Sequence, residues 1–114
     1  MNHSYPELNQ KILEMSEGDG EFQMELTNAV YNGLLELQVK YYEGLKGKNE
    51  ETIKQIRHKL KPTLSMFGFN DLIDEIQNGK EILESNGFTE EFELHFEQLN
   101  RLLEVAIERV FLLT

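Results

Sequence analysis

The chain has 114 residues, 39% of them hydrophobic, which is enough apolar material for one modest core rather than two. Its 21 acidic and 11 basic residues give a net charge of −10, which opposes general nucleic-acid binding. The absence of cysteine excludes disulfides, thiolate zinc sites and cysteine nucleophiles. No stretch has the pattern of a secretion signal or a membrane span, so we expect one domain over residues 1–114, located in the cytoplasm.

The first half of the chain predicts two helices, because apolar residues recur there at spacings of three and four. A short helix is expected over residues 5–16. After a turn at 17–20, Asp19 is a candidate cap for a second helix over about 21–42. The expected buried stripe of this second helix comprises Phe22, Leu26, Ala29, Val30, Gly33, Leu37 and Tyr41, widened by Leu34 and Val39.

The second half predicts three more helices. One begins at Asn49 or Glu50, with Asn49 as a candidate cap, and is closed by Gly68. The others are expected over about 70–84 and 89–113, separated by a stop signal at 85–87. Because short connections between long helices favour antiparallel neighbours, the predicted fold is all-α: an up-and-down antiparallel four-helix bundle with a short additional N-terminal helix.

The helix that begins near residue 50 carries the most informative histidine. His58 is expected on the side opposite Ile56 and Leu60, because each residue turns an α-helix by about 100°. Its imidazole should therefore point to solvent. An exposed histidine is by itself most often structurally neutral, but an uncharged imidazole is also a competent nucleophile at neutral pH.

Basic residues gather around this histidine. Four of the 11 in the chain fall between positions 54 and 61, namely Lys54, Arg57, Lys59 and Lys61. Lys54 and Lys61 share the helical face of His58, since they lie four residues before it and three after it. On an acidic protein this concentration favours a site for a phosphoryl group, because cations stabilise a phosphorylated product.

The run His58-Lys59-Leu60-Lys61, followed by Gly68, resembles the signature of histidine phosphotransfer (HPt) domains of two-component phosphorelays. The resemblance covers roughly residues 8–113, and its discriminating part is 55–72. It implies that His58 accepts a phosphoryl group through Nε2 and that Lys61 balances the phosphate charge. It also implies that Gly68 allows a tight turn.

Two positions depart from the family pattern. Pro62 stands where the family usually has glycine, and it removes the backbone donor for the carbonyl of His58, which should kink the helix at a cost of about 3 kcal/mol. Lys80 stands, by ungapped counting, where the family often has a glutamine or glutamate that orients the imidazole. A lysine cannot accept the Nδ1 proton, although it can contact phosphate. The neighbouring Gly79 marks either close helix packing or a weak point in the helix.

The resemblance implies transfer from a receiver's aspartyl phosphate to His58 and on to another receiver, with Mg²⁺ on the receiver and no cofactor bound by this chain. The partners would be response-regulator receiver domains or a hybrid sensor kinase. We expect the chain to bind neither nucleic acid nor a membrane and to be a monomer. Because receiver sites are acidic, association should be salt-sensitive. The expected docking residues are Lys54, Arg57, Lys59, Pro62, Ser65 and Phe69, whereas Met66 and Phe67 are expected in the core.

Three other functions can be built on a helical bundle that contains histidines. The main alternative is a non-catalytic helical module that binds a receiver or another signalling partner without accepting phosphate. The dimerising histidine domain of a sensor kinase is less favoured, since no ATP-binding domain accompanies the bundle within these residues. A di-iron site needs a glutamate three residues before a histidine on a helix. The residues three before His58 and His95 are Gln55 and Phe92, so this spacing is absent. His95 is instead expected to pack at a boundary between helices.

Overall fold

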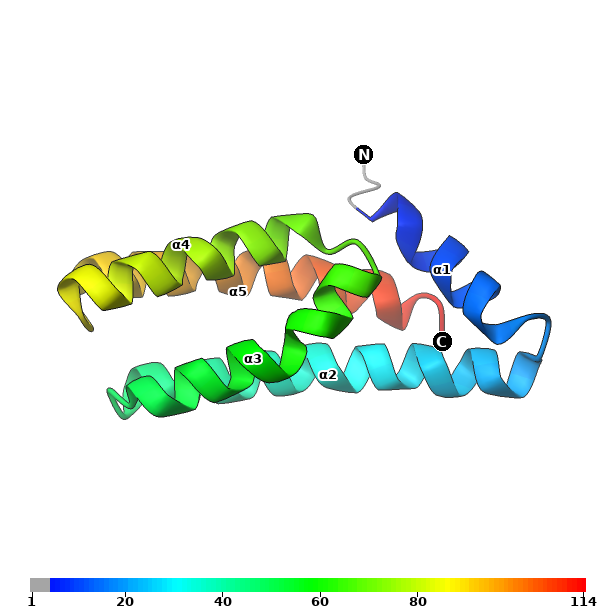
Figure 1. Cartoon of the computed structure of the whole chain (residues 1–114), viewed down its shortest axis with the longest axis horizontal. Coiled ribbons are helices and arrows are strands. Elements are labelled where there is room, and N and C mark those ends of the chain that lie inside the picture. Colours follow the sequence, from blue (N-terminus) through cyan, green and yellow to red (C-terminus); the bar gives the residue numbers. More distant parts are fainter. Residues whose placement is uncertain (1–4) are drawn as a thin grey trace.

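A computed structural model of the chain describes residues 5–114, and all regular structure in that range is helical. Figure 1 shows five helices: α1 (Pro6–Ser16), α2 (Gly20–Lys46), α3 (Glu50–Met66), α4 (Asn70–Asn86) and α5 (Glu90–Phe111). The prediction of an all-helical chain is confirmed. The largest difference is that α2 continues beyond residue 42, because Gly44 does not end it but lies buried against Ile53 of α3. No helix within the described range is both long enough and apolar enough to cross a membrane.

Side-chain caps begin α2 and α3 at the predicted residues. Asp19 Oδ1 accepts hydrogen bonds from the backbone N–H groups of Glu21 at 3.0 Å and Phe22 at 3.1 Å. Asn49 Oδ1 accepts one from the N–H of Thr52 at 3.1 Å. These bonds satisfy backbone donors that have no partner within the helix. The caps therefore fix where each helix starts.

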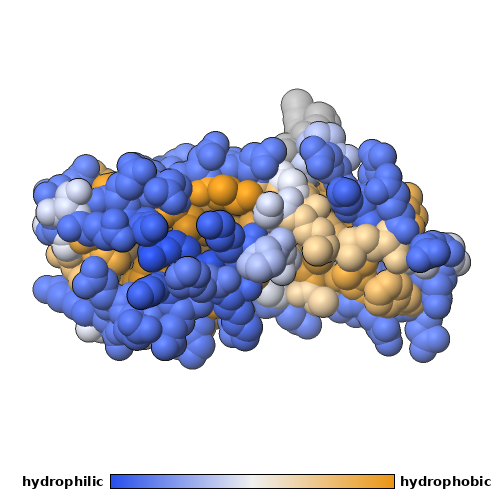
Figure 2. All heavy atoms as spheres, viewed as in Figure 1, coloured by the Kyte–Doolittle hydropathy of each residue, from blue (hydrophilic) through white to orange (hydrophobic). Residues whose placement is uncertain are grey.

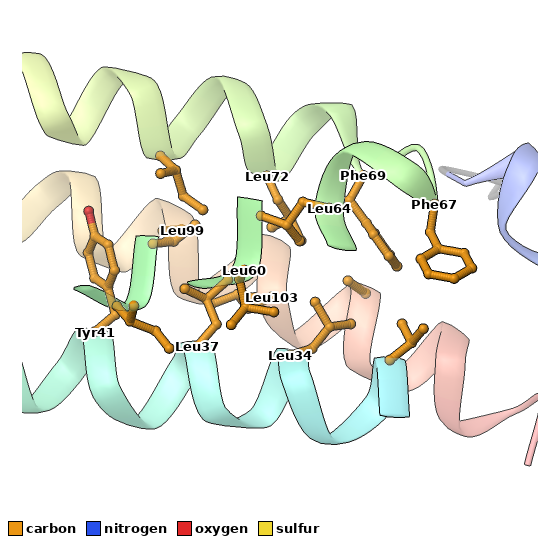
Figure 3. Packing of buried hydrophobic residues seen from close by; sticks show 14 of the residues in the cluster. Leu34, Leu37, Tyr41, Leu60, Leu64, Phe67, Phe69, Leu72, Leu99 and Leu103 are labelled. Atoms are coloured by element: carbon orange, nitrogen blue, oxygen red, sulfur yellow. The ribbon is translucent and has the colours of Figure 1, made fainter. Parts of the chain in front are cut away.

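The core lies between the helices. α2 packs along α3 and α5, α4 packs on α5 and α3, and α1 packs on α2. Figure 3 shows side chains from α2, α3, α4 and α5 meeting there, including Leu37, Leu60 and Leu103. The predicted stripe of α2 is wrong at three residues, which are exposed: Phe22 (41%), Ala29 and Val39 (52%). The buried face of α2 instead comprises Thr27, Val30, Leu34, Leu37, Tyr41 and Gly44.

The helix α3 bends near Pro62. Figure 1 shows its first part beside α2 and its last part turning towards α4. Proline has no N–H, and its ring collides with the carbonyl four residues earlier, which here belongs to His58. Leu60 and Leu64, on either side of the bend, are both buried. The predicted kink is present, and packing on both sides holds it in place.

Gly68 makes the tight turn from α3 into α4. Its φ of +74° lies in the left-handed region that other residues rarely adopt. The N–H of Phe69 donates to the carbonyl of Leu64 at 2.9 Å, which closes the turn. Phe67 and Phe69, on either side of the glycine, are both buried. The predicted role of Gly68 and the predicted core position of Phe67 are confirmed.

Candidate functional site

His58 is exposed on α3, as predicted, and lies at a groove between α3 and α4. The groove has an apolar floor and a polar rim, and we call it the inner groove. Its floor consists of Leu64, Ile73 and Ile76, and its rim of Arg57, His58, Lys61, Gln77 and Lys80. Figure 2 shows apolar surface between the hydrophilic side chains of this face.

The inner groove is small. It encloses about 90 Å³, roughly the volume of three water molecules in the liquid. This volume accommodates a phosphoryl-sized group, whereas pockets for drug-sized ligands usually reach about 300 Å³ or more. By itself, the inner groove therefore has room for a small group.

A second hollow, the outer groove, adjoins the inner one and has a volume of about 450 Å³. The two grooves share Arg57, His58 and Lys80. The outer groove adds the cation Lys54 and the apolar side chain of Leu83. It also adds three carboxylates: Glu50 and Glu51 near the start of α3, and Glu84 near the end of α4. His58 thus lies where the inner groove, with its apolar floor, meets the charged outer groove.

The structure brings most of the predicted cations to the histidine. Lys54 lines the outer groove, Lys61 lines the inner groove, and Arg57 and Lys80 line both. Lys80 belongs to α4, so positive charge stands on both walls around His58. Lys80, which by ungapped counting stands where the family often has the residue that orients the imidazole, thus lines both grooves together with His58.

Other predicted docking residues lie outside the grooves. The Nζ atom of Lys59 forms an ion pair with Glu36 Oε2 of α2 at 2.8 Å, so its side chain faces away from α4. Pro62 and Ser65 are exposed but line neither groove. These three residues therefore lie outside both grooves.

The prediction for Phe69 is wrong, because its side chain is fully buried and cannot contact a partner. The turn at Gly68 directs the ring inward, where it packs against Tyr5 with ring centroids 4.7 Å apart. The Tyr5 hydroxyl donates to Asp71 Oδ2 at 2.8 Å and so fixes this contact. Met66 is also corrected, since it is 46% exposed rather than part of the core. The exposed apolar side chain at the end of α3 is therefore Met66.

Gln77 is a groove residue that the sequence analysis missed. It lies on α4 three residues before Lys80 and four after Ile73, so all three share one helical face. Its Nε2 donates to Glu81 Oε2 at 3.1 Å. Because Lys80 had already been singled out, its spacing of three residues from Gln77 was the signal that would have identified Gln77.

A buried polar network lies behind the α4 wall. The side chain of His95, on α5, is fully buried, and its Nδ1 lies 2.7 Å from Glu75 Oε2. Its Nε2 lies 2.6 Å from the Tyr41 hydroxyl oxygen. A neutral ring protonated on Nδ1 satisfies both contacts, because it donates to the carboxylate and accepts from the hydroxyl. The predicted position of His95 between helices is confirmed.

Two opposing effects act on His95. Burial lowers its pKa, whereas the hydrogen bond and the negative charge of Glu75 raise it, and burial is the larger effect. Burial also raises the pKa of the Tyr41 hydroxyl well above its ordinary value. Both groups are therefore neutral at pH 7, which agrees with the hydrogen-bonding arrangement.

Gly79 leaves space for this network. A Cβ atom at position 79 would overlap the imidazole of His95, so the lack of a side chain lets α4 approach α5 closely. The reading of Gly79 as a sign of close helix packing is confirmed. Together, Glu75 and Gly79 hold the histidine against one side of α4.

Among residues 5–114, no group of three histidine, aspartate or glutamate side chains is placed to hold a metal ion. Comparison of the chain with protein-family models, with curated proteins and with solved structures finds no match. The candidate site is thus defined by its own geometry: an exposed imidazole between cations of two helices, beside a small apolar groove.

Proposed function

We propose that the chain is a histidine phosphotransfer protein of the HPt type. It would accept a phosphoryl group on His58 from the aspartyl phosphate of a receiver domain and pass it to another receiver. The observation that carries the proposal is the position of His58 beside cations on both walls of the groove, with Arg57 and Lys61 on α3 and Lys80 on α4.

The chemistry needs few groups from this chain. His58 Nε2 attacks the phosphorus atom, an N–P bond forms, and the P–O bond to the receiver aspartate breaks, so the aspartate leaves as a carboxylate. The reverse attack by a second aspartate completes the relay. Mg²⁺ on the receiver neutralises the charge that develops during transfer. The cations of the groove then stabilise phosphohistidine by charge-assisted hydrogen bonds.

The surface around His58 also suits an acidic partner. Lys54 extends the positive charge along the outer groove, and Pro62 is exposed one turn after His58 on α3. On a chain of net charge −10, a local basic patch directs an acidic active site to this face. Receiver domains meet that description.

The proposal includes the fold of the family, an up-and-down four-helix bundle formed by α2 to α5 with α1 as the additional helix. In support of it, α2 packs on α3 and α5, and α4 packs on α5 and α3. Short turns join the successive helices. A bundle of this kind presents His58 on a rigid helix rather than on a loop.

One observation favours the alternative of a non-catalytic interaction module. Lys80 stands on the α4 wall of the groove, and an ammonium group cannot accept the Nδ1 proton of an imidazole. In that case the same surface would bind a receiver without accepting phosphate. The two functions differ only in whether phosphate moves.

The test uses a panel of receiver domains charged with labelled phosphate in Mg²⁺. Wild-type protein and His58→Gln are compared for acid-labile, base-stable label on this chain. Lys61→Ala should slow labelling about tenfold, because a charge-assisted contact to the phosphoryl group is lost. Lys59→Ala is the matched control and should label at the wild-type rate, since Lys59 pairs with Glu36 outside the groove.

The outcomes separate the two functions. Label on the wild type and none on His58→Gln supports phosphotransfer. Receivers that bind without transferring label would favour the interaction module, and a chain that neither binds nor accepts label would contradict both.

A further inference from the structure

The network around His95 connects three helices at one point. Tyr41 belongs to α2, Glu75 to α4 and His95 to α5, and the two hydrogen bonds are 2.6 Å and 2.7 Å long. In Figure 3 the hydroxyl group of Tyr41 points from α2 towards the side of α4 and α5. The ring of Phe92 packs against both Tyr41 and His95. The relative positions of these helices therefore depend on the network.

The same network lies directly behind the α4 wall of the inner groove. Along α4, Glu75 is followed by Ile76, and Gly79 is followed by Lys80. Glu75 and Gly79 contact His95, whereas Ile76 and Lys80 line the groove with His58. A rotation or displacement of α4 at its contact with His95 would therefore move the groove wall.

The charged and titratable groups that face the network come from three elements. α2 contributes Tyr41, and α4 contributes Glu75. α3 contributes Arg57, whose positive charge acts on the Tyr41 hydroxyl and which also lines the groove. One cation of the His58 site is thus close enough to influence the buried network.

We propose that His95 is a positioning residue for the His58 site: its neutral ring holds the α4 wall of the groove, and protonation of the ring displaces that wall. The effect on phosphotransfer rests on the proposed function, but the movement itself does not. Protonation places a hydrogen on Nε2, so the Tyr41 hydroxyl can no longer donate there and needs another acceptor in a buried position. The buried positive charge also requires closer compensation from Glu75.

Two conservative variants predict opposite shifts. Tyr41→Phe keeps the ring but removes the donor that stabilises neutral His95, so protonation should occur at a higher pH. Glu75→Gln keeps the shape but removes the carboxylate that stabilises imidazolium, so protonation should occur at a lower pH. Each change should alter the proton affinity of His95 about tenfold, the usual effect of one hydrogen bond.

The measurement combines two signals and needs no receiver. NMR follows the His95 ring during titration, with His58→Gln used to assign the resonances. The variant Gln77→Cys, labelled with an environment-sensitive fluorophore, reports the groove wall, and the wild-type chain has no cysteine that would interfere. The variant Ser65→Cys, at a position of α3 outside both grooves, carries the same label and is the matched control.

The expected result is that the probe at 77 responds at the pH at which His95 titrates and shifts with it, upward in Tyr41→Phe and downward in Glu75→Gln. The fluorophore at position 65 should not respond at the pH at which His95 titrates. A wall probe that ignores His95 would overturn the proposal, as would shifts in the same direction in both variants or a His95 signal that does not titrate before unfolding. Because no phosphate transfer is measured, such a failure leaves the proposed function untouched.

Discussion

Gly79 is the residue on which the close approach of α4 and α5 depends. A methyl group there would occupy the space of the His95 imidazole, which hydrogen bonds hold on both sides. Gly79→Ala should therefore destabilise the protein by about 1 to 3 kcal/mol, the usual cost of overpacking, despite a gain of about 1 kcal/mol in helix propensity. Urea unfolding measures this change in the free energy of unfolding.

The control for Gly79→Ala is Gly20→Ala at the start of α2, where an added Cβ meets nothing within 4 Å. That substitution should leave the stability unchanged or raise it slightly. If Gly79→Ala proved as stable as the control, the His95 ring would have to be free to move, and its contacts would not fix α4.

Single residues were predictable from the sequence where one helix alone decides their environment. The exposure of His58 follows from its position opposite Ile56 and Leu60 on α3, and no other element is needed to derive it. Phe69 could not be placed this way, because the left-handed backbone at Gly68 changes the direction of the chain before that residue. Its burial also depends on Tyr5, which is distant in the sequence.

At the scale of elements, α3 differs most from a regular helix. Pro62 interrupts it one turn after His58, and its exposed ring contributes little packing. Pro62→Ala restores a backbone donor, and an interior proline costs about 3 kcal/mol relative to alanine. Because proline also restricts the unfolded chain, about 1 kcal/mol of that gain is lost. Thermal and urea unfolding should show a net stabilisation of about 2 kcal/mol.

The neighbouring exposed substitution Ser65→Ala, on the same turn of α3, serves as the reference and should change the stability much less. If Pro62→Ala destabilised the protein instead, the bend would be required for burying Leu60 and Leu64 on its two sides. The kink would then be a feature of the tertiary packing rather than a local cost.

The sequence predicted the existence and approximate bounds of all five helices, because caps and apolar spacing are local signals. Asp19 and Asn49 illustrate this, since each caps the helix that was expected to follow it. The grooves were not predictable in the same way. They arise from how α3 and α4 lie against each other, and Gln77 became part of the site only through that arrangement.

At the scale of the whole molecule, charge is unevenly distributed. Five of the 11 basic residues, Lys54, Arg57, Lys59, Lys61 and Lys80, lie on the two helices that form the groove, while the chain as a whole carries −10. The sequence showed a concentration of basic residues only in the segment that forms α3. Lys80 of α4 was singled out only by ungapped counting along the family pattern, and the fold brings it to the same groove as His58.

The stability of the whole molecule should depend on pH through His95. Burial lowers the pKa of this residue in the folded state, whereas the unfolded chain keeps the ordinary value of about 6.5. Well above pH 6.5 both states are neutral at this position, and the residue adds no pH dependence. As the pH falls below about 6.5 the unfolded state binds more protons, so the free energy of unfolding decreases.

Urea unfolding of wild type and His95→Gln between pH 7.5 and 5 isolates this effect, because the other titrating groups are common to both proteins and largely cancel in the difference. We expect the stability advantage of the wild type to shrink as the pH falls. An advantage that grew instead would mean that the charge of Glu75 outweighs burial and that the folded protein prefers the imidazolium. In that case the Tyr41 hydroxyl oxygen would accept from Nε2–H at low pH instead of donating to Nε2, while Nδ1–H would still donate to Glu75.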